Sequence, residues 1–164
     1  MVDIGVIFSL FACLWLGSCV YALWRGGRPE QFVAIIFLVA VPLSLVAYIP
    51  DPWRGVQWLI LAIDTVMLVL MLAIAFRANR YWPMGMAAMQ LLEVVGHLIK
   101  LTDPAMLHVV YWISAVVWSY PMLILLWLGT IRHHNRVKRF GPEGSWSNSS
   151  NRSAAPTPTP SPEP

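Results

Sequence analysis

One stretch of the chain, residues 90 to 100, carries four side chains that can do acid–base chemistry or bind a cation. They are Gln90, Glu93, His97 and Lys100. With about 100° between successive helical residues, these positions fall within an arc of about 80°. Glu93 and His97 are also four residues apart, so they can hydrogen-bond along one helix face. The spacing predicts one helix with a single polar stripe inside an otherwise apolar segment.

Two further ionisable residues, Asp64 and His108, lie in the neighbouring apolar segments. Counting at 1.5 Å per residue puts Asp64 about 18 Å and Glu93 about 15 Å from the outer ends of their segments, near the bilayer midplane. His97 and His108 both lie about 8 to 9 Å inward, at matching depth. We therefore expect deep carboxyls and imidazoles nearer the outer face. The predicted polar cluster comprises Asp64, Gln90, Glu93, His97, Lys100 and His108.

Four kinds of role are compatible with such a cluster. The groups can satisfy one another and hold the bundle together, since interhelical polar contacts average only about 0.6 kcal/mol. Carboxylates and histidines in membranes also relay protons; in that case Asp64 and Glu93 would share a proton that His97 exchanges with the outer face. Two imidazoles at equal depth, His97 and His108, can ligate a haem iron or join a carboxylate around a divalent metal. A membrane-embedded enzyme on the same residues is the remaining alternative.

Five long apolar segments must position these residues. An apolar run of about 20 residues spans the roughly 30 Å hydrocarbon core of a bilayer. The chain is 58% hydrophobic and 12% charged, about half the charge content of a soluble domain. We therefore predict an all-α membrane protein, a bundle of five transmembrane helices. The predicted spans are residues 4–24, 31–49, 55–76, 81–99 and 105–130.

Charge in the connecting loops predicts the orientation of the bundle. The loops after the first and third segments carry two basic residues each, and four follow the fifth segment. The other loops carry only Arg54 and Lys100. Basic residues mark the cytoplasmic side, so we expect the N-terminus outside and the C-terminus inside, in a multi-pass protein of the cell inner membrane.

The basic residues after the fifth segment are expected to contact anionic lipid headgroups. They are Arg132, Arg136, Lys138 and Arg139. Membrane orientation accounts for the net charge of +3, so we expect the lipid bilayer as partner and no nucleic acid. Another membrane protein is a further candidate partner.

The amino-acid composition of the chain changes after Phe140. Residues 141–164 are rich in Ser, Asn, Thr and Pro, and Trp146 is the one large apolar side chain among them. Such a composition cannot bury enough apolar area to offset the entropy of ordering. We expect a transmembrane helical domain over residues 1–140 and a disordered cytoplasmic tail over residues 141–164.

Short stretches carry a resemblance. The runs Tyr81–Met84, Gly96–Leu98 and Trp118–Pro121, together with Glu93, resemble small polytopic bacterial inner-membrane proteins of unknown function. The resemblance implies a location in the inner membrane and brings no activity with it.

Motifs of soluble enzymes are missing from the sequence: it has no phosphate-binding loop, nucleophile elbow, CxxC or HExxH. We therefore expect a small integral membrane protein that acts as a non-catalytic accessory or regulatory protein. The alternative is a proton-coupled carrier or channel that uses Asp64, Glu93 and His97. A haem- or metal-binding membrane protein, with His97 and His108 as ligands, is a further alternative, and no other cofactor is expected.

Overall fold

The fold consists of long α-helices. The computed structural model describes residues 4–48, 57–78, 80–102 and 117–140, and no strand occurs in these ranges. Five helices of 20 to 22 residues make up this part of the chain. They are α1 (Ile4–Arg25), α2 (Arg28–Ala47), α3 (Trp58–Arg77), α4 (Trp82–Thr102) and α6 (Ser119–Phe140). The prediction of an all-α protein is confirmed.

The first four helices coincide with apolar segments predicted from the sequence, and short turns join two pairs of them. Pro29 lies in the first turn of α2, where the missing N–H of proline costs nothing. In the turn before it, a Cβ at Gly26 would lie 2.4 Å from the carbonyl oxygen of Ala22, so the chain can close here only with glycine. Such short turns make α1 and α2, and likewise α3 and α4, antiparallel neighbours.

The last described helix, α6, runs past the apolar segment predicted to end at Thr130. It continues through the basic stretch to Phe140. Hydropathy detects apolar composition rather than helix ends, and residues 131–140 contain neither Gly nor Pro, while Arg and Lys are good helix formers. Residues 103–116, with the start of the predicted fifth span and His108, lie outside the described residues, as does the predicted tail.

Four helices, α1 to α4, are long and apolar enough to cross a membrane. Their outward faces carry large apolar side chains such as Val46 and Phe76, which are 84% and 86% exposed. Exposed apolar surface on this scale is unfavourable in water and is satisfied by lipid chains. These features are compatible with a multi-pass membrane protein.

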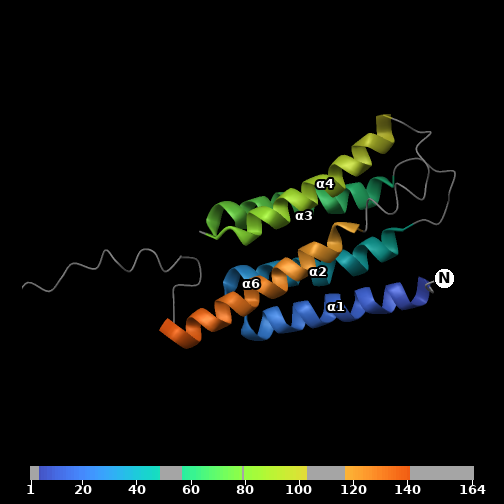
Figure 1. The fold of residues 1–164 in the computed structure, drawn as a ribbon. Helices are drawn as coiled ribbons and strands as arrows, with labels where there is room; N and C mark the ends of the chain where they lie inside the picture. Colours follow the sequence, from blue (N-terminus) through green and yellow to red (C-terminus); the bar gives the residue numbers. More distant parts are fainter. Residues whose placement is uncertain (1–3, 49–56, 79, 103–116, 141–164) are drawn as a thin grey trace, which may run out of the picture.

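The helices pack as a closed ring. Each helix contacts the next in the order α1, α2, α3, α4 and α6, and α6 contacts α1 again. In addition, α2 touches α6 across the ring. The most extensive contact joins α3 and α4. Figure 1 shows these two helices lying together on one side, with α1, α2 and α6 on the other.

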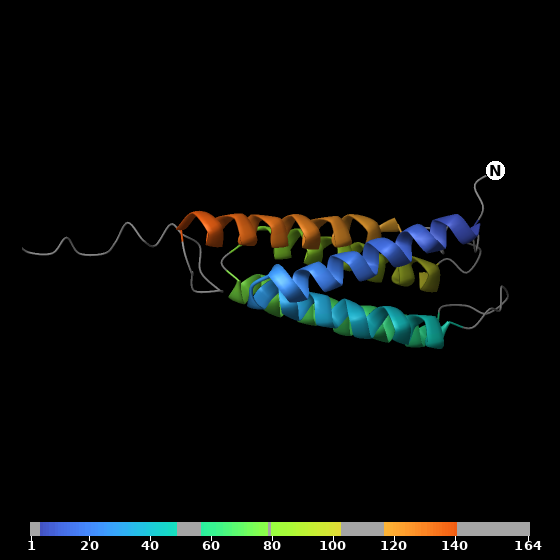
Figure 2. The ribbon, with the colours of Figure 1, turned by 90° about the horizontal axis from the view of Figure 1, so that it is seen from below.

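One end of the bundle collects the turns. Figures 1 and 2 show the α1–α2 turn, the α3–α4 turn and the C-terminal end of α6 together, with the start of α1 at the opposite end. We call the end that holds these two turns the turn end. Arg25, Arg28 and Arg77 are exposed there. α6 extends beyond the other helices at this end.

The core of the ring contains small residues and methionines. Small side chains such as Ala22 and Ala34 allow the helix backbones to approach closely. Methionine is flexible and fills irregular gaps between them. The larger buried apolar side chains are Phe37, Met67, Met71, Met86, Met122, Leu123 and Leu126.

A close contact between α4 and α6 gives a test of this packing. A Cβ at Gly129 would lie 3.1 Å from two carbon atoms of the Trp82 ring. Gly129→Val should therefore overpack the interface, cost about 1–3 kcal/mol and lower the melting temperature in detergent. Gly17→Val is the matched control, because a Cβ at Gly17 would meet no described atom within 4 Å. Equal melting temperatures for the two variants would contradict the packing of α4 on α6.

Candidate functional site

The polar stripe predicted on one helix lies on α4 and faces the interior of the bundle. Gln90 is fully buried, and Glu93, His97 and Lys100 are also buried. The apolar residues between them, such as Leu91, Leu92 and Leu98, are exposed on the outer face. The helix therefore places its charged side inward and its apolar side outward, which is the arrangement expected in a lipid environment.

His97 reaches from α4 to a carboxylate on α3. Its Nε2 lies 2.9 Å from Oδ2 of Asp64, and both side chains are buried. A proton lies between these two atoms in either form of the pair: a neutral histidine donates to a carboxylate, or a protonated one forms an ion pair. The structure thus brings together Asp64 and His97, two members of the predicted polar cluster.

Gln90 joins the two carboxylates. Its Nε2 donates to Oε2 of Glu93 at 3.1 Å and lies 3.5 Å from both Oδ1 and the backbone oxygen of Asp64. The amide of Gln90 thus lies between the two acids, and all three side chains are buried. Like charges at short range in a low-dielectric site repel strongly.

A third helix completes the group. Ser119, at the start of α6, donates from Oγ to Oε1 of Glu93 at 3.0 Å. We call Asp64, Gln90, Glu93, His97 and Ser119 the carboxylate network. It ties α3, α4 and α6 together at one level of the ring. Sequence reasoning did not identify Ser119, because a lone serine between two aromatic residues gives no signal of its partner.

The remaining two predicted members of the cluster are Lys100 and His108. Lys100 is buried one turn beyond His97 on the same face of α4. His108 lies outside the described residues, so the predicted pairing of His97 and His108 around a haem or a metal stays a prediction. Among the described residues, no group of three or more His, Cys, Asp or Glu side chains could hold a metal ion.

A second buried polar group, not predicted from the sequence, lies at the turn end. Arg80, in the α3–α4 turn, donates from Nη1 to Oε1 of Glu30 on α2. Its Nη2 lies 3.4 Å from Nδ1 of His133 on α6. All three side chains are buried. We call Glu30, Arg80 and His133 the turn cluster.

The sequence held one weak signal of the turn cluster. Glu30 is the only acidic residue in the otherwise basic loop after the first apolar segment. Arg80 is one of the two basic residues after the third apolar segment, which served only to predict the orientation, and His133 lies within the basic stretch after the fifth segment. The contact between Glu30 and Arg80 could not be inferred from the sequence, since 50 residues separate them.

The basic residues expected to contact lipid headgroups lie on the last turns of α6. Arg132, Lys138 and Arg139 are exposed, and Arg136 is partly buried. Their contact with lipid stays a prediction.

Comparison with known proteins gives no relative. No protein-family model matches the chain, and neither a curated protein nor a solved structure matches it.

The bridging amide offers a stability test of the carboxylate network. Gln90→Met keeps the size of the side chain but removes the donor between the two carboxyls. The loss of this buried hydrogen bond should cost about 1–3 kcal/mol and lower the melting temperature in detergent. Met89→Leu, a partly buried neighbour on the same helix, is the control and should cost less. If both variants melt alike, Gln90 does not hold the network together.

Proposed function

We propose that the chain is a five-span protein of a bacterial-type inner membrane, with its N-terminus outside and its C-terminus in the cytoplasm. Four helices of sufficient length and apolarity support this, together with the apolar fifth segment at residues 105–130. The gathering of exposed arginines at the turn end supports the orientation, because basic residues favour the cytoplasmic side. The tail after Phe140 then lies in the cytoplasm.

Reporter fusions test this topology. Fusions after Arg80 and after Phe140 should both report the cytoplasm, and a fusion after Arg54 should report the opposite side. Fusion proteins of equal expression, checked by immunoblot, provide the control. A cytoplasmic signal at Arg54 would rule out the five-span arrangement.

Within this bundle, the carboxylate network binds and passes a proton, and the protein is a proton-coupled carrier or channel that uses Asp64, Glu93 and His97. The observation that carries the proposal is the 2.9 Å contact of His97 Nε2 with Asp64 Oδ2 in the interior of the bundle. Ionisable groups inside a membrane are costly, roughly 2.5–3.5 kcal/mol each at a helix centre. A chain of groups that can each hold a proton is what a relay requires.

The hydrogen bonds give the relay an order. A proton on His97 can pass to Oδ2 of Asp64, and the Gln90 amide contacts both Asp64 and Glu93, the two carboxyls that would share it. Ser119 donates to Glu93 and stabilises its ionised form when the proton resides on Asp64.

Removal of one carboxyl tests the relay. Asp64→Asn keeps the shape of the side chain and should leave the bundle folded, while proton flux into liposomes falls about tenfold or more. Thr65→Val is the matched control, because Thr65 is exposed and hydrogen-bonds only to Leu61 of its own helix. Its flux should equal that of the wild type.

Infrared spectroscopy provides a second measurement on the same variants. The wild type should show the band of a protonated carboxylic acid at neutral pH, and Asp64→Asn or Glu93→Gln should remove it. A wild type without this band, or a band that survives both substitutions, would exclude the shared proton.

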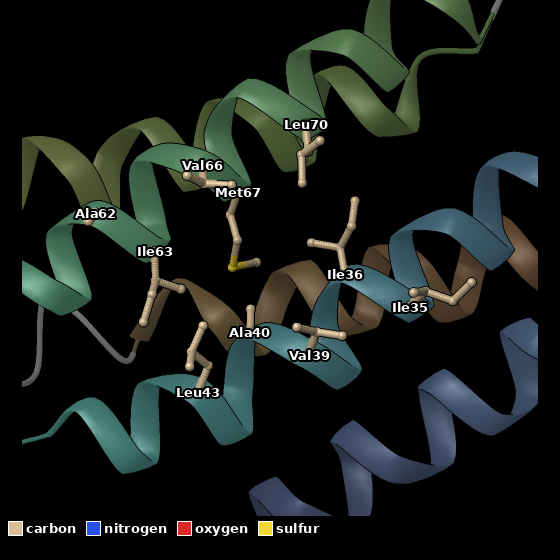
Figure 3. A pocket seen from close by; sticks show the side chains of 10 residues that line it. All are labelled: Ile35, Ile36, Val39, Ala40, Leu43, Ala62, Ile63, Val66, Met67 and Leu70. Carbon is tan, nitrogen blue, oxygen red and sulfur yellow. The ribbon is translucent and has the colours of Figure 1, made fainter.

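A non-catalytic accessory or regulatory role is the second candidate, and one surface favours it. A groove of about 410 Å³ opens between α2 and α3, and all the residues that line it are apolar. Figure 3 shows Met67 reaching into it from α3 and Ile36, Ala40 and Leu43 bordering it on α2. In a bilayer, such a groove is covered by acyl chains or by a helix of another protein. Co-purification of a membrane protein after mild detergent extraction, with no proton flux in liposomes, would favour this role.

A further inference from the structure

We propose that the turn cluster is a second proton-binding site, in which Glu30 and His133 hold the proton and Arg80 controls access to it. The inference rests on the proposed proton pathway and extends it, because it adds a proton-binding site at the end of the bundle opposite to the start of α1. Its three residues come from α2, the α3–α4 turn and α6.

Burial of Glu30 is the first observation. The side chain is fully buried, and Arg80 donates to its Oε1. Its other oxygen, Oε2, is buried and accepts no hydrogen bond from any described residue. Leaving a buried acceptor unsatisfied costs about 1–3 kcal/mol, more for a charged group. A proton bound at Oε2 would relieve this cost.

The tautomer of His133 is the second observation. A guanidinium has only donors, so the contact of Arg80 Nη2 with His133 Nδ1 requires Nδ1 to be the acceptor. The imidazole is then neutral and carries its hydrogen on Nε2. While Arg80 lies against Nδ1, no proton can bind there.

The position of Gly27 joins these two observations. A Cβ at Gly27 would lie 3.1 Å from Oε2 of Glu30 and 3.1 Å from Nε2 of His133. The N–H of the imidazole and the unsatisfied oxygen therefore border the same small space beside the α1–α2 turn. A side chain at position 27 would press against both groups, and glycine avoids this contact.

The proton balance follows from this geometry. Nδ1 of His133 takes up a proton when Arg80 withdraws, and the imidazolium then passes its Nε2 proton to Oε2 of Glu30. One proton enters and none leaves, so the net charge of the turn cluster rises by one. Neutralising Glu30 also weakens its ion pair with Arg80, which favours the withdrawal. Loading of the site and movement of Arg80 are thereby coupled.

The charges around the turn cluster are mainly positive. Glu30 is the only acidic residue described at the turn end. The pKa of His134, the neighbour of His133, is lowered by desolvation and by the cations Lys138 and Arg25. His134 is therefore neutral at neutral pH and does not compete for the proton. The cations on the packed elements are Arg25 on α1, Arg28 on α2, Arg77 on α3 and Arg132 and Arg136 on α6.

An apolar layer separates the turn cluster from the carboxylate network. Ser119 and His133 lie 14 residues apart on α6, or about 21 Å at 1.5 Å per residue. Buried Met122, Leu123 and Leu126 occupy the stretch of α6 between them. A proton crosses such a layer only when it hydrates, which is how hydrophobic constrictions gate. The two clusters are thus separate sites along α6.

Two adjacent histidines allow a matched experiment on the full-length protein in proteoliposomes. His133→Gln should lower proton flux about tenfold or more, whereas His134→Gln should leave it unchanged. Glu30→Gln should behave like His133→Gln. Melting temperatures of all variants in detergent show that they are folded.

Spectroscopy on the same protein separates this inference from the proposed function. With ¹⁵N-labelled histidine, His133 should show a hydrogen on Nε2 and none on Nδ1 at neutral pH. On acidification, protonation of Nδ1 and the infrared band of protonated Glu30 should appear together. A hydrogen on Nδ1 at neutral pH, or separate transitions, would overturn the site.

The flux result decides between the remaining outcomes. Unchanged flux in His133→Gln, with a conducting wild type, would overturn the role of the turn cluster in the pathway. A wild type without any flux would overturn the proposed function. The turn cluster would then be tested by the spectroscopy alone, through the joint protonation of His133 and Glu30.

Discussion

A polar side chain in the apolar interior of a helix bundle needs its partner within the protein, and this constraint organises the helices. Asp64 lies among apolar residues of α3 and finds its partners on α4, in Gln90 and His97. This contact turns the polar stripe of α4 inward and accompanies the most extensive helix packing in the ring. Ser119 then draws the start of α6 to the same level through Glu93. Lipid cannot replace any of these hydrogen bonds.

The carboxylate network and the turn cluster each pair a histidine with a carboxylate, but the third group differs. In the first, the neutral amide of Gln90 brings two carboxyls together, so their protonation states depend on each other. In the second, the permanent charge of Arg80 compensates Glu30 and selects the tautomer of His133. The first arrangement places one amide donor between two acids, and the second places an ion pair beside a histidine.

Periodicity and composition were sufficient to predict part of this structure. The 100° spacing located the stripe of α4, and the depth of Asp64 predicted that it would meet that stripe. Ser119 and the turn cluster could not be predicted, because their contacts arise only when α2, the α3–α4 turn and α6 close the ring. The end of α6 was also missed, since apolar composition stops at Thr130 while helix-forming residues continue to Phe140. The number of spans and their orientation stay predictions from charge and hydropathy.

α6 has a mechanical consequence because it touches both polar groups. Ser119 at its start bonds to Glu93, and His133 near its end lies against Arg80. An α-helix is stiff over this length, so a shift of one of its ends along the axis is carried to the other. A slide of about 1.5 Å, the rise of a single residue, is enough to lengthen either hydrogen bond beyond its working range. A shift of α6 along its axis that breaks one of these contacts therefore displaces the other as well.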